Sequence, residues 1–200
     1  MQFITFALAA LSIGSVFAAP STVVRRDPLL DAAISAVNTA EAAVASEVAI
    51  INTAVTGTIN NQAITAIQGS LTNIAAAISS VTSAVTPLVT GVALPLSQAE
   101  LNSLSGLVTS VENIASNVQT AANGILSNVT GLSSILVKAQ ALAVLATINP
   151  FVQPVIQFAN SAITGITDPV VSTIQSTLSS ISDIVSNLLG PILTAILGLL

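Results

Sequence analysis

Few side chains in this sequence could carry out covalent chemistry. The chain contains no Cys, His, Trp or Tyr, so it lacks the most common general base, the thiolate nucleophile and the usual zinc ligands. A serine hydrolase without histidine would need a serine–lysine pair, and the nearest such pair is Ser134 and Lys138. Their spacing differs from the Ser-x-x-Lys of known serine–lysine enzymes and fits two neighbours on one helical turn. We therefore expect a protein that is not an enzyme and that takes no metal or cofactor.

The N-terminal region carries signals for secretion. Residues 1–18 contain an apolar run followed by small residues, which is typical of a signal peptide cut after Ala18. The run is shorter than the roughly 20 residues needed to cross a bilayer. Residues 19–26 end in the dibasic pair Arg25-Arg26, which is typical of a pro-segment removed by a subtilisin-type processing protease. We expect a secreted protein, either extracellular or in a cell wall.

Removal of the first 26 residues would leave an acidic chain with a single cation. Lys138 then stands against all eight acidic residues, which gives a formal charge of −7. Nucleic acid is excluded as a partner, because phosphate binding needs clustered Lys and Arg and base stacking needs aromatic side chains. Without cysteine no disulfide can form, although a secreted protein meets an oxidising environment.

Aliphatic residues recur at steps of three and four along four stretches of the chain, residues 30–55, 64–88, 101–125 and 171–188. This spacing predicts amphipathic helices, each with an apolar stripe on one side. The remaining positions carry Ser, Thr, Asn, Gln and Ala, where surface helices usually carry Lys, Glu and Arg. Burial of the stripe must therefore provide most of the stability of each helix.

Capping residues mark where several of these helices begin. Asp27-Pro28 and Asp168-Pro169 each combine an N-cap Asp with a Pro at the first helical position. Asn60 or Asn61 can cap the second helix, and Ser97-Gln98-Ala99-Glu100 forms a capping box before the third.

The remaining helix boundaries complete the expected architecture. A helix is expected over about residues 133–146, and Asn149-Pro150 opens a separate short one. Because short loops join antiparallel neighbours, we expect an all-α, up-and-down bundle of five to six amphipathic helices without disulfides. The bundle would span residues 27–189 and be followed by an apolar tail, residues 190–200.

Three further features of single residues have simple interpretations. Glu41 takes one position in the first apolar stripe, and we expect it at the edge of that stripe. Phe151 and Phe158, the only aromatic residues after the signal peptide, lie seven apart on one helix face and are expected in the core. Asn128 begins the only N-glycosylation sequon, Asn-Val-Thr, and is expected at the surface.

These features together resemble one known family. The signal and pro-segment precede a helix over residues 29–55, the segment Leu96-Ser97-Gln98-Ala99-Glu100-Leu101, and a later Asn149-Pro150-Phe151-Val152-Gln153-Pro154 before another helix. The arrangement is similar to the fungal hydrophobic surface-binding protein A family, which includes the ligand-binding domains of cell wall galactomannoproteins. The resemblance implies a helical bundle that adsorbs to hydrophobic solids or holds fatty-acid-like lipids in its core.

We therefore expect a non-enzymatic protein that binds hydrophobic surfaces or lipids through aliphatic helix faces. A cell-wall polysaccharide or a recruited secreted enzyme are further possible partners. The residues expected to face a ligand come from the second and third stripes and are Ile67, Leu71, Ile74, Ile78, Val81, Leu104, Val108 and Val111.

The alternative is a structural cell-wall protein held by a GPI anchor. Residues 188–200 would be the apolar tail that is removed, residues 177–187 the spacer, and Ser176 the attachment site. Against this interpretation, the apolar stripe continues through the spacer at Leu178 and Ile181.

Overall fold

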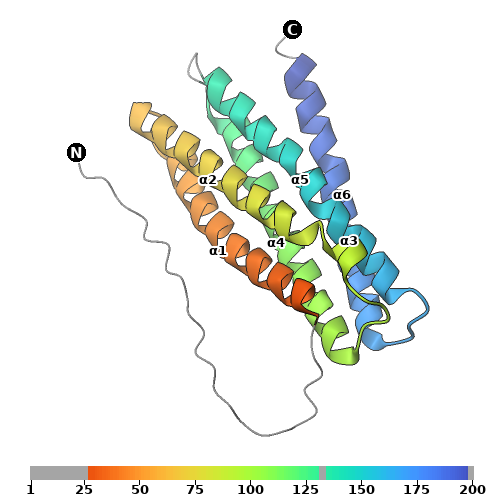
Figure 1. The fold of residues 1–200 in the computed structure, drawn as a ribbon. Helices are drawn as coiled ribbons and strands as arrows, with labels where there is room; N and C mark the ends of the chain where they lie inside the picture. Colours follow the sequence, from red (N-terminus) through yellow and green to blue (C-terminus); the bar gives the residue numbers. More distant parts are fainter. Residues whose placement is uncertain (1–26, 131–133, 198–200) are drawn as a thin grey trace, which may run out of the picture.

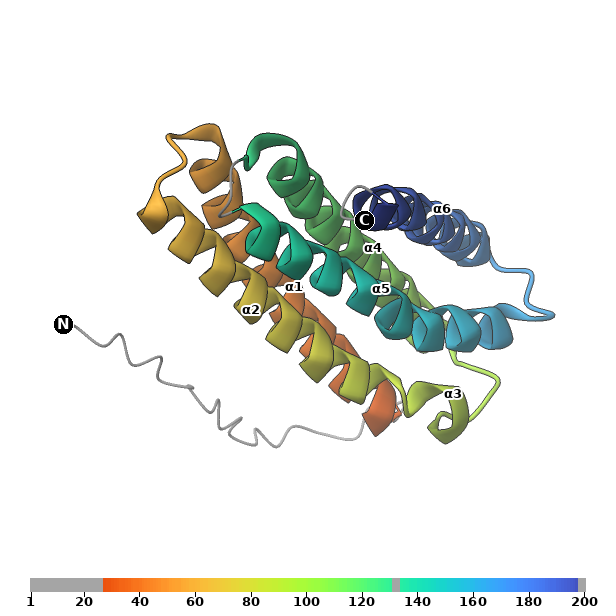
Figure 2. The same cartoon turned by 90° about the horizontal axis from the view of Figure 1, so that it is seen from above.

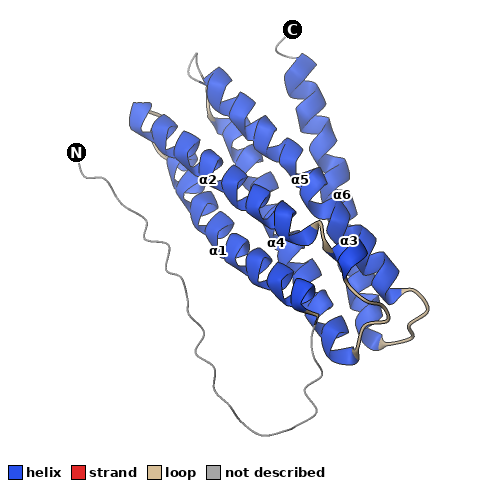
Figure 3. Cartoon of the chain, in the orientation of Figure 1, coloured by secondary structure: helices blue, strands red, loops and turns tan. Residues whose placement is uncertain are grey.

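A computed structural model describes residues 27–130 and 134–197 of the chain, and within these ranges it contains helices and no strand (Figure 3). Ala18, Arg25 and Arg26, the residues of the expected processing sites, lie outside the described residues. The helices are α1 (Pro28–Thr56), α2 (Asn61–Val85), the single turn α3 (Leu88–Gly91), α4 (Gln98–Asn128), α5 (Ser134–Ile163) and α6 (Pro169–Leu197). The predicted all-α bundle of five to six helices is confirmed.

Four of the long helices close a ring around the core. Helix α1 packs against α2 and α4, and α5 packs against the same two helices from the opposite corner. The order around the ring is therefore α1–α2–α5–α4, and the connection through α3 leads from α2 to α4 across the ring (Figures 1 and 2). Helix α6 lies outside the ring, where it packs mainly on α4 and less extensively on α5. Successive long helices run in alternating directions (Figure 1).

The expected N-caps are present. The backbone N–H of Leu29 donates to Asp27 Oδ1 at 2.8 Å, and that of Val170 donates to Asp168 Oδ1 at 2.9 Å. Asn60, the first of the two candidates, caps α2 by accepting from the N–H of Ala63 at 2.9 Å. Each cap satisfies one of the N–H groups that the first turn of a helix leaves without a partner.

The capping box of α4 also forms. The N–H of Ser97 donates to Glu100 Oε2 at 2.8 Å, and the N–H of Glu100 points back to Ser97 Oγ. The second carboxylate oxygen, Glu100 Oε1, accepts from the N–H of Asp27 at 3.1 Å. This bond joins the first residue of the described chain to the start of α4.

The expected separation of α5 into two helices is wrong. Pro150 and Pro154 lie inside one continuous helix, Ser134–Ile163. An internal Pro removes a backbone hydrogen bond and normally breaks or kinks a helix. Here the exposed Pro150 is flanked by Ile148 and Phe151, which are fully buried. The side of α5 that carries Ile148 and Phe151 stays packed in the core past the prolines. This packing outweighs the free-energy cost of the backbone hydrogen bonds that the prolines remove.

Aliphatic side chains from all five long helices form one core. Phe151 and Phe158 are buried in it, as expected. The stripe of α1 passes through Ala40, which is 5% exposed, in place of the neighbouring Glu41. Glu41 lies half-buried at the edge, where its Oε1 accepts from Asn113 Nδ2 of α4 at 2.7 Å. The expected edge position of Glu41 is confirmed.

Helix α4 is buried over a wider arc than its stripe predicted. Besides the predicted residues, Leu107, Ile114 and Ala121 are 1% exposed. The arc is wide because α4 lies between other helices: Asn113 bonds to α1, and Glu112 accepts a hydrogen bond from Ser180 of α6.

Helix α6 continues past the expected end of the bundle. It passes through Gly190 and Pro191 and ends at Leu197. The backbone of the apolar tail is therefore helical over residues 190–197. The side chains of residues 189–197 are not among those described.

Candidate hydrophobic binding surface

The residues expected to face a ligand lie together in the closed core. All eight are between 0% and 3% exposed: Ile67, Leu71, Ile74, Ile78, Val81, Leu104, Val108 and Val111. They can meet an external apolar phase only where the helices move apart. Any surface available to a partner in this conformation must therefore lie on the outside of the bundle.

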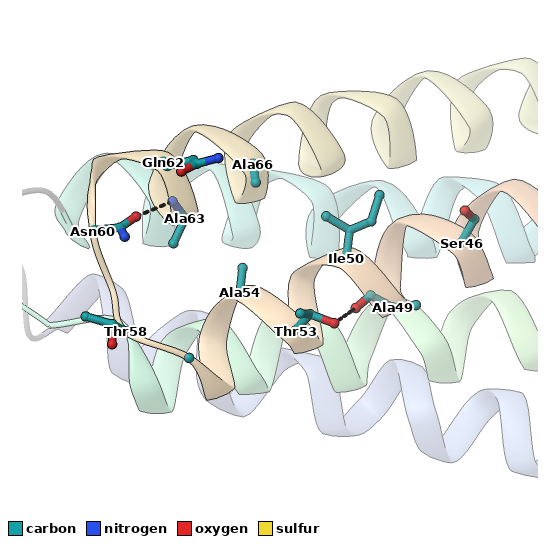
Figure 4. Close-up of a pocket in the computed structure, with 11 residues that line it drawn as sticks. Ser46, Ala49, Ile50, Thr53, Ala54, Thr58, Asn60, Gln62, Ala63 and Ala66 are labelled. Atoms are coloured by element: carbon teal, nitrogen blue, oxygen red, sulfur yellow. Dashed lines mark hydrogen bonds between the residues drawn. The ribbon is translucent and has the colours of Figure 1, made fainter.

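Two hollows lie between α1 and α2 on the outside of the bundle. The larger, of about 630 Å³, opens near the α1–α2 turn and is drawn in Figure 4, where Ile50, Ala54 and Ala66 point into the space between the helices. The smaller, of about 460 Å³, lies further along the same helix pair. Most of the lining residues are small. On α1 they include Ala32, Ala36, Thr39, Ala43, Ser46, Ile50 and Thr53.

These α1 residues follow each other at steps of four and three, so the two hollows share one face of the helix. We call this face, together with the adjoining face of α2 that carries Gln62, Ala66, Ala77 and Ser80, the outer seam. Near its middle Glu47 Oε1 accepts from Asn73 Nδ2 at 2.8 Å. The outer seam was not predicted from the sequence, although a second three–four spacing, of small residues along α1, marks its position.

The hydroxyl groups on the outer helix faces are largely satisfied by their own helix. Thr53 Oγ1 in the outer seam donates to the carbonyl oxygen of Ala49 at 2.9 Å (Figure 4), and Thr39 Oγ1 donates to that of Ser35 at 2.8 Å. The same bond to the carbonyl one turn earlier forms on every long helix, for example at Thr65, Thr72, Thr109, Ser161, Thr177 and Ser182. These side chains therefore do not depend on water to satisfy their donors.

Several large aliphatic side chains are also exposed. Leu29, Ile50, Val89, Leu94, Ile135 and Leu136 are between 36% and 60% exposed. Ile50 lies within the outer seam, where small neighbours leave it prominent. Leu136, at 60%, is the most exposed of the six and lies in the first turn of α5.

The remaining candidate residues are placed as follows. Lys138 is half-buried on α5, the helix that begins at Ser134, so the two belong to one helical turn as interpreted. Asn128 is exposed at the last position of α4, and its Nδ2 donates to the carbonyl oxygen of Gly124 at 2.9 Å. Across residues 27–130 and 134–197, no group of three or more His, Cys, Asp or Glu residues could hold a metal ion.

Length and composition also allow a membrane-spanning interpretation of some helices. Three stretches within the described residues are long and apolar enough to cross a membrane by these criteria: Pro28–Thr56, Asn61–Gly91 and Ile135–Ile163. In the folded chain each of them contributes buried side chains to the core.

Comparison with known proteins gives no relative. No family model, no curated protein and no solved structure matches the chain.

Proposed function

We propose that the chain is a secreted, non-enzymatic protein that binds hydrophobic surfaces or lipids, including fatty-acid-like amphiphiles, through apolar helix faces. The observation that carries this proposal is the chemistry of the outer faces. They are nearly uncharged, and many of their hydroxyl donors are already bonded to backbone carbonyls, as at Thr39 and Thr53 in the outer seam.

The free-energy cost of moving an outer helix face out of water depends on its hydroxyl groups. A hydroxyl that leaves water without a hydrogen-bond partner costs roughly 1–3 kcal/mol by protein mutational data. A hydroxyl that keeps its bond to the preceding turn avoids most of this cost. The methyl groups of Ala and Thr, and the exposed side chain of Ile50, then gain from burial at about 25 cal/mol per Å².

The core offers a second apolar surface. Helix α6 lies outside the four-helix ring and packs mainly on α4, so it is the long helix with the fewest neighbours. Moving it would expose aliphatic residues of α4 and α6 while leaving the ring in place. On an oily surface these residues would exchange one apolar contact for another, which makes the hydrophobic cost of opening small.

The GPI-anchored alternative is less well supported. Its spacer, residues 177–187, lies within α6, where Leu178 and Ile181 are buried against the bundle. Cleavage at Ser176 would remove Ile181 and Leu188 from the core and would truncate α6 in its first third. We therefore propose that the tail is retained.

Depletion of the purified protein from solution tests the proposal. Polyester beads, alkyl-coated beads and a fatty-acid dispersion would each be mixed with protein across a salt series. Adsorption through apolar contacts persists or strengthens at high salt, whereas charge–charge attraction is screened. Loss of adsorption at high salt, or no uptake by any hydrophobic phase, would exclude this mechanism.

A further inference from the structure

The charged side chains are unevenly distributed along the length of the bundle. At one end α1, α4 and α6 finish and α2 and α5 begin (Figure 1). The stretches nearest this end carry Lys138 as their one charged side chain, and we call them the acid-free end: residues 48–72, 113–130, 134–146 and 184–197. The opposite end carries four of the eight acidic residues, Asp27, Asp31, Glu100 and Asp168.

The other four carboxylates lie well back from the acid-free end. Glu47 is the nearest, and it lies nine residues before Thr56, the last residue of α1. At the rise of an α-helix this is about 14 Å. Glu41, Glu112 and Asp183 lie further still from the ends of their helices. Because the Debye length at physiological ionic strength is about 8 Å, a charged surface that touches the acid-free end interacts only weakly with these carboxylates.

The acid-free end also carries the two most exposed of the large aliphatic side chains. Ile135 is 53% exposed and Leu136 is 60% exposed, and both belong to the first turn of α5. Lys138 follows them, is half-buried and forms no ion pair with a described residue. A lysine in this position can bury its methylene groups while its ammonium group reaches outward. The start of α5 therefore combines an apolar contact with a cation.

We propose that the acid-free end docks on a lipid surface that carries anionic headgroups, such as ionised fatty acids. Ile135 and Leu136 enter the apolar layer, and the ammonium group of Lys138 lies among the headgroups. The inference rests on the proposed function and names an orientation and a lipid class for it. Charge complementarity supports it: the mature chain carries a formal charge of −7, and this end approaches an anionic surface with its lysine forward and its carboxylates beyond the Debye length.

The other apolar features of the surface do not suit an anionic partner. Docking along the outer seam would bring Glu47 onto the surface, because its bond to Asn73 lies near the middle of the seam. Docking through the opposite end would use the exposed side chains of Leu29, Val89 and Leu94, but it would press the carboxylates of that end against headgroups of the same charge. The headgroup charge therefore selects the acid-free end, whereas an uncharged oily surface leaves the outer seam available.

Vesicle binding by the mature chain tests the choice of lipid. Phosphatidylcholine vesicles would be compared with phosphatidylcholine vesicles that contain oleate, at a pH that ionises the oleate. The unglycosylated chain is used, so that no sugar on the exposed Asn128 covers this end. We expect Lys138→Gln to weaken binding to the oleate vesicles about fivefold and to leave binding to phosphatidylcholine alone unchanged. Lys138→Arg keeps the charge and should bind as the native chain does.

A pair of charge-adding variants tests the orientation. Leu136→Asp places a carboxylate at the acid-free end, and we expect it to weaken binding to oleate vesicles severalfold. Val89→Asp is the matched control, because Val89 is exposed to 43% in α3 at the opposite end. It should bind within twofold of the native chain. Both positions are exposed, so both variants should keep the native circular dichroism.

Fluorescent labels give a readout of orientation that does not depend on affinity. The chain has no cysteine, so one introduced cysteine is labelled uniquely. Ser127→Cys lies at the acid-free end and Thr167→Cys at the opposite end, and both positions are exposed. An environment-sensitive dye should shift to shorter wavelength on oleate vesicles at position 127 and stay unchanged at position 167.

The outcomes separate this inference from the proposed function. Equal dye shifts at the two positions, equal weakening by Leu136→Asp and Val89→Asp, or full binding of Lys138→Gln to oleate vesicles would overturn the docking inference. Absence of binding to oleate vesicles would do the same. If hydrophobic beads still remove the protein from solution in any of these cases, the proposed function stands. If no hydrophobic phase takes up the protein, both fail.

Discussion

The backbone N–H of Asp27 donates to Oε1 of Glu100 at 3.1 Å, across a separation of 73 residues. Glu100 is also the acid of the α4 capping box. One carboxylate therefore fixes the starts of α1 and α4 together. Asp27 is also the residue at which the mature chain is expected to begin.

We predict that cleavage after Arg26 strengthens this contact. The neutral N–H of Asp27 would become a charged ammonium group facing the Glu100 carboxylate, a gain of about 1 kcal/mol at a partly exposed site. Thermal unfolding of a chain that begins at Asp27 should occur above that of a chain that begins at Ala19. Glu100→Gln should reduce the difference. A secreted protein whose N-terminal sequence is mainly Ala19 would contradict the processing step itself.

A second prediction concerns the outer seam. Ile50→Asp places a charge on the exposed side of α1, where Ile50 is 44% exposed, so we expect a loss of stability of at most about 1 kcal/mol. Adsorption to alkyl-coated beads should fall severalfold, because the charge must be desolvated at the surface. Gln157→Asp, at an exposed position of α5, is the control. Equal adsorption by the two variants would show that the outer seam is not the preferred face.

A third prediction concerns the core stripe of α2. Ile74 is fully buried, and Ile74→Ala should lower the free energy of unfolding by about 2–5 kcal/mol. Ile74→Asp should unfold the bundle, because it buries an unpaired charge. Denaturant titration followed by circular dichroism measures both changes. If Ile74→Asp folds normally and adsorbs as the native chain does, the stripe has neither of the roles proposed for it.

A fourth prediction concerns the C-terminal end of α6. Deletion of residues 190–200 should weaken retention on hydrophobic beads while leaving most of the helical circular dichroism, because Leu188 and the core residues before it remain. Mass measurement of the native protein from culture medium provides the complementary test. A chain that ends near Ser176 with an ethanolamine-linked glycan would establish the anchored alternative.

The sequence predicted those features of the fold that depend on one side chain and the backbone next to it, or on the spacing of residues within one helix. The caps at Asp27, Asn60, Ser97 and Asp168 depend on a single side chain and the next turn of backbone, so they could be recognised directly. The core stripes could also be predicted, because the three–four spacing of aliphatic residues along a helix decides which of its sides is buried. The position of Glu41 also followed, because a carboxylate cannot occupy the centre of an aliphatic stripe without a partner.

Features that depend on several helices at once could not be predicted in this way. The continuity of α5 through Pro150 is decided by buried neighbours that come from other parts of the chain. The extra buried row at Leu107, Ile114 and Ala121 exists because α4 has α1, α5 and α6 around it. For the candidate site, the stripe residues were identified but lie in the core, while the outer seam required the packed helices.

The ring order α1–α2–α5–α4 has a consequence for the shape of an adsorbed film. The α1–α2 hairpin meets the hairpin formed by α4 and α5 mainly along α1/α4 and α2/α5, and the chain between them passes through α3 at one end of the bundle. The two hairpins can therefore part along one plane with each hairpin intact. Spread on an oily surface, with α6 also displaced from α4 into the same layer, they would form a layer one helix thick, about 10–12 Å, against roughly twice that for the closed bundle. Neutron reflectometry at an oil–water interface distinguishes the two thicknesses.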